Sequence, residues 1–379
     1  MRILHVVEVD HGGVVSYVSD LGREQIRRGH EVHLLAPKGV FDLSGAHDHE
    51  WSMRRKRPTS LLSATLKLRR AVRRIQPDVV HLHSFFPGLL GRMRLTKGSG
   101  PPRVYQPHAW AFDATANPRI RRVIAGWERL AARRGDAIVA CSSSELEAGL
   151  SWRIPVHPEP LGSPVDVDRF HPVGEEIRAK WRAELGVRAP RLLVCVGRLC
   201  RQKAQELLLD AWTRSPAPNT ELVLVGPGDP GPLLERLPAE LRSTVRAVGG
   251  WNDVRPWLWA CDLVVVAARY EANSLSTGEA LACGRPVVTT DVGGAHDAVG
   301  AGSSEPAGCV VPQEAVDALL REAKARLDDP ELTACEGMNA RIRAERIFAP
   351  SALVERFDAF YAQVTARAAE LRPTGRQTR

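Results

Sequence analysis

The chain has 379 residues and a formal net charge of +8, and 44% of its residues are hydrophobic while 25% are charged. This length exceeds what one ordinary hydrophobic core supports, so we expect two domains. The composition is that of a soluble globular protein, and because no run of eighteen apolar residues occurs, a transmembrane helix is not expected.

The first half of the chain alternates short β-rich runs with longer amphipathic ones. Strands are expected at 2–9, 31–37, 78–83, 103–107 and 137–142, and helices at 14–28, about 60–75 and about 119–134. The segments 38–58 and 84–100 are expected to be loops. Strands separated by helices in this order indicate βαβ units and a parallel sheet.

The alternation stops at about 155–175, where five prolines and no apolar periodicity indicate a linker. It resumes with strands at 191–197, 221–226, 262–268 and 286–290, and with helices at 203–213, 275–283 and about 350–370. We therefore predict two doubly wound Rossmann-like domains, at 1–160 and 175–349, with a hinge at 161–174 and a C-terminal helix and tail at 350–379. Ligands bind beyond the carboxyl ends of such strands, which predicts an interdomain cleft.

The stretch RYEANSLSTGEA, residues 269–280, places Glu271 and Glu279 just after a buried strand. A helix beginning near Leu275 would point the amides of Ser274, Leu275 and Ser276 outward, which suits a phosphate. Carboxylates only accept hydrogen bonds, so the paired acids suit a ligand with many hydroxyl groups. The alternative is an ordinary helix cap with an acid in the first turns.

A second cluster lies in VCVGRLCRQKAQ, where Arg198 follows a strand and Lys203 comes at the start of the next helix. Lysine is disfavoured at the positive end of a helix, so a bound diphosphate would explain its position. The alternative is a surface pair that solvates a βα turn.

Three further features come from glycine and histidine. Gly12 and Gly13 follow the first strand and open a helix, so the backbone there can approach a ligand closely. His108 lies just beyond a strand and could hydrogen-bond a substrate, although a lone histidine near a tryptophan is more often structural. We expect His81 and His83 to point to opposite faces of their strand, which argues against a two-histidine metal site.

GPGDPG, at 226–231, matches the dinucleotide-binding pattern G-x-G-x-x-G. It contains a proline, however, and no acid follows at the required distance, so dinucleotide binding is not expected.

The charge is unevenly distributed along the chain. Residues 1–160 contain 25 lysines and arginines against 15 acids, whereas the remainder contains 27 against 29. The helix at 59–76 carries Lys67, Arg69, Arg70, Arg73 and Arg74 opposite its leucines. The basic half could meet nucleic acid, anionic lipid or an anionic substrate, or its arginines could simply be solvated.

Taken together, these stretches resemble the retaining glycosyltransferases of family 4. The resemblance rests on Gly12-Gly13, DVVHLHS (78–84), VDVDRF (165–170), GRLCRQK (197–203), the Glu271-x7-Glu279 element and EALACGRPVVTTDVGG (279–294). It implies the GT-B fold, with two Rossmann-like domains and a C-terminal helix that returns to the first. Ala204, where the family often has glycine, and Ala272-Asn273-Ser274, in place of a glycine-rich loop, depart from the pattern.

The resemblance also implies roles for individual residues. Arg198 and Lys203 would hold the donor diphosphate, Glu279 the ribose and Glu271 the sugar hydroxyls. The loop from Asn273 to Ser276, Leu275 included, would hold phosphate or sugar, Gly12 and Gly13 would contact the β-phosphate, and His108 would lie near the anomeric side of the donor sugar. Catalysis would then rest on His108, Arg198, Lys203 and Glu271, with no metal, no other cofactor and no side chain needed as a general base.

The predicted function is retaining transfer of a hexose-type sugar from a nucleotide sugar, with UDP as the expected nucleotide, to an unidentified acceptor hydroxyl. The acceptor would be a carbohydrate, a lipid-linked sugar or a small natural product, contacted by the segments 38–58 (with HDHEW and MRRKR) and 84–100. A cytoplasmic location, with peripheral contact of the basic half at the inner membrane face, is expected, and nucleic acid is not. The alternatives are a sugar-nucleotide epimerase of the same fold and a non-catalytic basic protein that binds membranes or nucleic acid.

Overall fold

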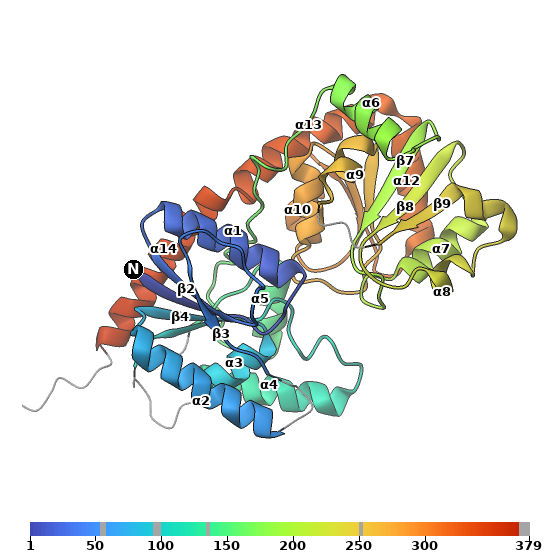
Figure 1. Cartoon of the computed structure of the whole chain (residues 1–379). Helices are drawn as coiled ribbons and strands as arrows, with labels where there is room; N and C mark the ends of the chain where they lie inside the picture. Colours follow the sequence, from blue (N-terminus) through green and yellow to red (C-terminus); the bar gives the residue numbers. More distant parts are fainter. Residues whose placement is uncertain (54–57, 94–99, 134–136, 250–252, 371–379) are drawn as a thin grey trace, which may run out of the picture. The chain divides into compact units, whose positions relative to one another are not determined.

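The computed structural model describes residues 1–53, 58–93, 100–133, 137–249 and 253–370. The basic run predicted at 53–57 lies outside the described residues except for Met53. The chain divides into two compact units, the first formed by Met1–Pro164 with Pro350–Arg379 and the second by Val165–Ala349. Each unit contains one six-stranded parallel sheet (Figure 1).

The first sheet has the strand order β3-β2-β1-β4-β5-β6. Its strands are β1 (Arg2–Val6), β2 (Glu31–Ala36), β3 (His47–Glu50), β4 (Val79–His83), β5 (Arg103–Gln106) and β6 (Ala137–Ile138). The central strands are almost continuously buried because helices cover both faces of a parallel sheet. Val80 and Leu82 of β4 join one hydrophobic cluster, while His81 and His83 lie on the opposite face of the same strand.

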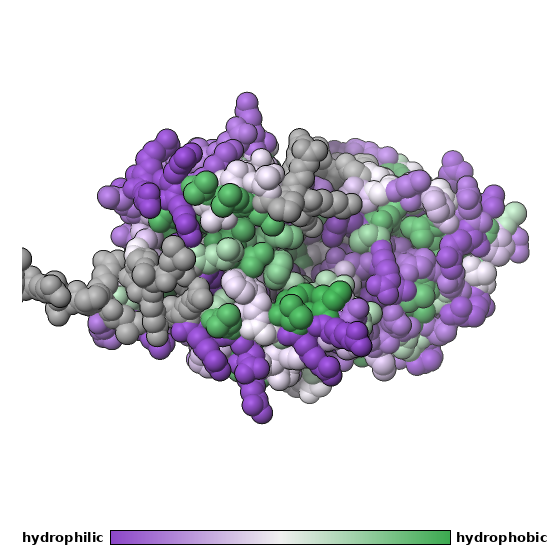
Figure 2. Space-filling view, turned by 90° about the horizontal axis from the view of Figure 1, so that it is seen from below, coloured by the Kyte–Doolittle hydropathy of each residue, from purple (hydrophilic) through white to green (hydrophobic). Residues whose placement is uncertain are grey.

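The helices of the first unit are α1 (Gly13–Arg27), α2 (Pro58–Ile75), α3 (Phe85–Arg92), α4 (Pro118–Ala132), α5 (Ser143–Ser151) and α14 (Pro350–Glu370). The expected return of the C-terminal helix to the first unit is confirmed, since α14 packs on α1 and Arg28 Nη2 donates to Ser351 O at 2.7 Å. The underside of this unit, where α2 and α4 lie, shows hydrophobic side chains among hydrophilic ones (Figure 2).

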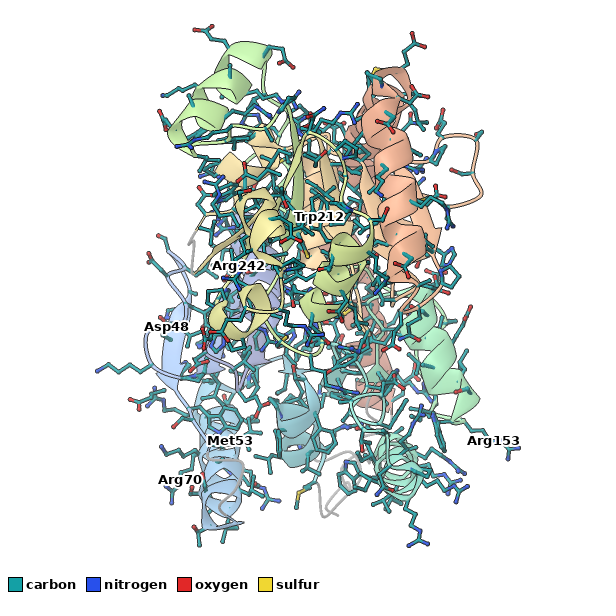
Figure 3. All side chains as sticks on the ribbon, turned by 90° about the vertical axis from the view of Figure 1, so that its right-hand side faces the viewer. Asp48, Met53, Arg70, Arg153, Trp212 and Arg242 are labelled. Carbon is teal, nitrogen blue, oxygen red and sulfur yellow. The ribbon has the colours of Figure 1, made fainter. Side chains whose placement is uncertain are left out.

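The helix α3 was not predicted, because 84–100 was expected to be a loop, and neither was the strand β3, because 38–58 was expected to be one as well. Its sequence, HDHE, has neither the β-branched residues nor the alternation of a typical strand. Among the strands that the structure describes it is an edge strand whose single neighbour is β2, and charged residues are common on such edges. Trp51, which follows it, is fully buried and donates from Nε1 to Ala64 O at 3.0 Å, so this side chain anchors the strand. Asp48 marks the strand in Figure 3.

The second sheet has the order β12-β11-β10-β7-β8-β9. Its strands are β7 (Arg191–Val196), β8 (Thr220–Val225), β9 (Val245–Val248), β10 (Leu263–Val266), β11 (Val287–Thr290) and β12 (Gly308–Val311). Along β7, Leu192, Val194 and Val196 pack into one hydrophobic cluster, whereas Leu193 and Cys195 pack into another. This alternation shows that both faces of the sheet are covered.

Helices of the second unit complete these two clusters. They are α6 (Glu175–Glu184), α7 (Gln205–Arg214), α8 (Gly231–Leu234), α9 (Arg255–Ala260), α10 (Leu275–Ala282), α11 (Ala295–Val299), α12 (Val316–Asp328) and α13 (Pro330–Ile347), with a short 3₁₀ helix at Ala239–Thr244. Trp257 of α9 belongs to the first cluster, and Trp212 of α7, labelled in Figure 3, belongs to the second. Both units are therefore Rossmann-like, as predicted.

Candidate active site

The carboxyl edge of the second sheet gathers the predicted cations and carboxylates. Arg198 follows β7, Lys203 precedes α7, and Glu271 follows β10, which is a parallel neighbour of β7. Lys203 Nζ lies 2.6 Å from Glu271 Oε1, and the two side chains are only 16% and 10% exposed. The fold thus brings this predicted pair together, and the carboxylate offsets the unfavourable position of a lysine at the start of α7.

Two glutamines that the sequence reasoning missed hold the loop around Arg198. Gln205, which is buried, donates from Nε2 to Arg198 O at 2.9 Å. Gln202 accepts from Arg198 Nη2 at 3.3 Å and donates to Tyr270 O at 3.1 Å, so it links the loop after β7 to the loop after β10. Polar residues at the start of a helix are common, and no sequence signal distinguished these two. Arg198 itself is exposed.

Glycines allow the loops at this edge to pack backbone against backbone. A Cβ atom on Gly226 would lie 2.2 Å from Gly197 O, and one on Gly293 would lie 2.1 Å from Glu271 O. The first glycine of the GPGDPG stretch therefore has a packing role, as does the glycine pair that ends DVGG. Lys203 is part of the same packing, since its side-chain carbons lie 3.0 Å from the Cβ position of Gly197.

The helix α10 begins as predicted, with Ser274 as its N-cap residue. The amides of Thr277 and Gly278 donate to Ser274 O at 3.1 and 3.2 Å, so those of Leu275 and Ser276 come ahead of the first intrahelical hydrogen bonds. The first turn is uncharged, which leaves its positive end available to an anion.

Several polar side chains lie close together around the start of α10. Ser274 Oγ lies 3.1 Å from Ser276 Oγ, and Asn273 lies against Gly294, whose Cβ position is 2.7 Å from Asn273 Oδ1. Glu279 lies one turn inside α10 and is half-buried. The segment from Glu271 to Glu279 therefore combines carboxylates, hydroxyls and a helix N-terminus.

The carboxyl edge of the first sheet contains the other predicted residues. Gly12 is the N-cap residue of α1 with φ 95°, a conformation that favours glycine, and Gly13 is the first residue of the helix. Tyr17, one turn later, is buried and packs edge-on against His108, with 4.7 Å between the ring centroids. The start of α1 and His108 are thus close together in this unit.

His108 follows β5 in a loop with unusual backbone conformation. His108 and Ala109 have φ values of 52° and 84°, in the left-handed region. His108 Nε2 lies 2.9 Å from His83 Nδ1, and His108 Nδ1 lies 3.5 Å from Cys141 Sγ. Burial lowers the pKa of His108 to about 3, so the ring is neutral at physiological pH.

Glu145 supports this loop from α5, and sequence reasoning did not single it out. Its carboxylate accepts hydrogen bonds from the amides of Ala109 and Cys141, at 2.7 and 2.6 Å. Burial raises the pKa of Glu145 to about 7, although these two hydrogen bonds act in the opposite direction.

Comparison with known proteins identifies the family. Two family models match in succession, Glycosyltransferase Family 4 over residues 11–169 and Glycosyl transferases group 1 over residues 190–329. A D-inositol 3-phosphate glycosyltransferase of Actinosynnema mirum is 30% identical, over 76% of this chain and 78% of its own length. The chain belongs to glycosyltransferase family 4. It is therefore a transferase, in preference to the epimerase and the non-catalytic binding protein considered from the sequence.

Other members and structures agree with this assignment. A GDP-mannose-dependent alpha-mannosyltransferase of Mycobacterium tuberculosis is 29% identical, over 80% of this chain and 81% of its own length. Anabaena Alr3699/HepE, solved in complex with UDP and glucose, superposes with a TM-score of 0.80 at 19% identity, covering 96% of this chain and all of its own. The family 4 glycosyltransferase thus has the GT-B fold, as predicted. None of its described helices is long and apolar enough to cross a membrane.

The prediction about the two histidines of β4 was wrong. His81 and His83 lie on the same face of β4, with 4.0 Å between their ring centroids, because residues two apart in a strand point the same way. Nitrogen atoms of His5, His81 and His83 lie within 4.8 Å of one another, so the argument from opposite faces against a histidine metal site does not hold.

Proposed function

We propose that this protein transfers a hexose from a nucleoside-diphosphate sugar to an acceptor hydroxyl with retention of configuration. The observation that carries the proposal is the Lys203–Glu271 ion pair beside the uncharged first turn of α10. A cation, a helix N-terminus and a carboxylate placed together suit a diphosphate that is followed by a sugar rich in hydroxyl groups.

The site residues take the roles that the family pattern implies. Arg198 and Lys203 bind the diphosphate and stabilise the charge that develops on the leaving nucleotide. Glu271 accepts from sugar hydroxyls and Glu279 from the ribose. In the first unit, Gly12 and Gly13 contact the β-phosphate and His108 contacts the donor sugar. The reaction uses no metal, and the leaving phosphate takes the acceptor proton.

The donor base and the acceptor are open to experiment. The sequence analysis favoured UDP, whereas one relative is named as GDP-mannose-dependent. Another relative is named for D-inositol 3-phosphate, which makes a hydroxyl of a polar, anionic molecule one acceptor class to screen alongside carbohydrates and lipid-linked sugars. The donor is the better starting point because most of its predicted contacts, Arg198, Lys203 and the segment from Glu271 to Glu279, form a compact set in the second unit.

Calorimetric titration of the pure protein with UDP, GDP and ADP, with and without magnesium, tests the proposal. We expect one nucleotide to bind without magnesium, and Glu279→Ala to weaken that binding. Glu235→Ala, an exposed acid of the same unit, serves as the matched control and should bind as the unmodified protein does. If a folded sample binds none of the three, the proposed donor site is wrong.

We also propose that the underside of the first unit contacts an anionic membrane surface. Leu62 of α2 is 65% exposed and Val123 of α4 is 73% exposed, and both lie on helices rich in arginine. Arg70, labelled in Figure 3, lies on the exposed face of α2. Apolar side chains among basic ones suit an interface with anionic headgroups.

Vesicle sedimentation tests this contact. The protein should bind vesicles containing anionic lipid, with binding that falls as salt rises, and should not bind purely zwitterionic vesicles. A variant combining Leu62→Ser, Leu66→Ser and Arg70→Ser should lose binding. Ile177→Ser, at a similarly exposed residue of the second unit, should retain it. Equal binding to both kinds of vesicle, or none at low salt, would contradict the proposal.

A further inference from the structure

A row of hydrogen bonds crosses the first unit from α1 to the loop that carries His108. Gln25 Oε1 lies 2.8 Å from His5 Nε2, and His5 Nδ1 lies 2.9 Å from His83 Nε2. His83 Nδ1 in turn lies 2.9 Å from His108 Nε2. Four side chains from α1, β1, β4 and the loop after β5 therefore form one continuous chain.

The direction of this chain follows from its first member. An amide oxygen can only accept, so His5 must donate from Nε2 and, as a neutral ring, must accept at Nδ1. His83 then has to donate from Nε2 and accept at Nδ1. By the same step, His108 donates from Nε2 to His83, which leaves His108 Nδ1 without a proton.

At the His108 end of the chain, the hydrogen-bond partners are consistent with this direction. His108 Nδ1 faces Cys141 Sγ at 3.5 Å, and a thiol can donate to an unprotonated ring nitrogen. The thiol itself accepts from Gln106 Nε2 at 3.1 Å, and the same amide donates to Tyr17 Oη at 2.9 Å. Tyr17 Oη in turn donates to Gly162 O at 3.2 Å. The Gln106 amide, the Tyr17 hydroxyl and the Cys141 thiol thus each meet an acceptor, whereas Gln25 Nε2, at the opposite end, has no hydrogen-bond partner in this network.

Burial keeps the chain uncharged. Gln25, His5 and His83 are fully buried. Burial lowers the pKa of His5 to about 4 and that of His83 well below its usual value. Neutral rings in series have only two consistent arrangements of protons, and the amide of Gln25 selects one of them.

We propose that Gln25, His5 and His83 are positioning residues that hold His108 as the tautomer protonated at Nε2. His108 Nδ1 is then an acceptor, and a hydroxyl group of the donor sugar replaces the long contact with the Cys141 thiol. The role of His108 toward the sugar rests on the proposed function, whereas the tautomer follows from the first unit alone.

A metal ion held by His5, His81 and His83 is the competing explanation for the cluster. Such an ion would need His5 Nδ1 or Nε2 and His83 Nδ1 or Nε2, and all four nitrogens already face partners in the chain. His81 stands apart from the chain, because its Nδ1 lies 2.7 Å from Tyr361 Oη. The hydrogen bonds therefore favour the chain of neutral rings.

Nitrogen-15 NMR of the histidine rings in the full-length protein tests the tautomer directly, because protonated and unprotonated ring nitrogens have distinct shifts. His108 should appear as a single Nε2–H tautomer that does not change between pH 5.5 and 8. In Gln25→Met, which removes the acceptor with little change in size, His83 and His108 should become mixtures of both tautomers. In Gln25→Glu, which keeps an acceptor, His108 should remain the Nε2–H tautomer.

Tyr105→Phe is the matched control, since it removes a buried hydroxyl of the same unit that contacts Glu128 and takes no part in the chain. It should not alter the His108 signals. A His108 ring protonated at Nδ1 in the unmodified protein, or identical spectra for Gln25→Met and the unmodified protein, would overturn the proposal. So would a change of the His5 and His83 signals on addition of a chelator, which would indicate a metal ion.

Kinetics then separates this inference from the proposed function. Gln25→Met should raise the donor KM about tenfold, the lower end of the effect seen when a residue that orients a metal-binding histidine is replaced. Its affinity for the free nucleotide should not change, because the proposed nucleotide contacts are made by the second unit and by the backbone at Gly12 and Gly13, and not by His108. An altered tautomer with unchanged donor KM and kcat would overturn the role assigned to His108. Absence of nucleotide binding in the unmodified protein would instead contradict the proposed function, and the NMR result would stand on its own.

Discussion

The carboxyl edge of the second sheet is built from opposite charges in contact, whereas that of the first sheet is built from neutral rings in series. At the second edge, Lys203 and Glu271 pair beside a helix N-terminus and Arg198 is exposed. At the first edge, His108, His83 and His5 are held uncharged by burial. Charge attracts an anionic group strongly, while a neutral ring of fixed tautomer selects the geometry of a hydroxyl group.

The largest expected effect is at the charged edge. Lys203→Ala should lower kcat/KM for sugar transfer by about 100-fold or more, because it removes a cation that stabilises the leaving diphosphate and leaves the Glu271 carboxylate without its partner. Steady-state kinetics with the donor found by titration provides the measurement. Arg214→Ala, which breaks an exposed pair with Asp317, should change kcat/KM little. Equal effects in the two variants would mean that Lys203 has no specific role in sugar transfer.

The pH dependence of the free energy of unfolding tests whether the carboxyl edge of the first sheet stays uncharged. The pKa of Glu145 is about 7 in the folded protein and about 4.5 in an unfolded chain. Between these values the unfolded chain releases the proton first, so the free energy of unfolding should fall as pH rises from 4.5 to 7, by about 3 kcal/mol, and then level off. Denaturant unfolding at pH 5, 6, 7 and 8 measures this slope.

The comparison variant is Glu145→Gln, which cannot ionise. Its free energy of unfolding should fall less steeply over the same pH range, even if its stability is lower throughout because the amide accepts less well from Ala109 and Cys141. Parallel curves for the two proteins would mean that Glu145 is not the group responsible.

Close packing at the second edge predicts a loss of stability. Gly226→Ala should reduce the free energy of unfolding by about 2 kcal/mol, because the new Cβ would lie 2.2 Å from Gly197 O and displace the loop that carries Arg198. Gly174→Ala provides a control, since its φ is −70° and its Cβ position has no atom within 4 Å. Chemical unfolding of both variants, followed by nucleotide titration, separates packing from binding.

The smallest effect concerns a feature that both edges share. Ala204 and Ala109 have φ values of 53° and 84°, in a region that costs a residue with a Cβ about 1 kcal/mol or more. Ala204→Gly and Ala109→Gly should therefore each raise the free energy of unfolding by up to about 1 kcal/mol, partly offset by the entropy of glycine. Thermal melts should show a small upward shift, and a decrease at either position would contradict the strain argument.

Much of the fold could be predicted from local pattern. Apolar runs such as those of β1, β4 and β7 predicted strands within a few residues of their observed bounds, since each is long enough to show buried periodicity. The strand expected at 137–142 forms only at Ala137–Ile138, because Ser142 caps α5 by accepting from the Glu145 amide at 3.2 Å. The strand β3 has no pattern of its own and exists because β2 offers it an edge.

The site residues also divide into those that local pattern predicts and those that only tertiary contacts reveal. Glu271, Lys203 and Ser274 could be found because each follows a recognisable strand or opens a helix. Gln202 and Gln205 could not, since their role depends on backbone oxygens of other loops. The histidine chain was missed through an error in strand geometry and because His5, His83 and His108 are far apart in the sequence.

By itself, the sequence determined two parallel-sheet domains, the family and the positions of the charged groups after strands, because strand and helix periodicity and βα turn composition are local properties. The tertiary structure alone decided which residues touch: that Lys203 meets Glu271, that four side chains align into a chain ending at His108, and that HDHE becomes a strand. These outcomes depend on the order and register of strands distant in the chain, which local chemistry does not encode.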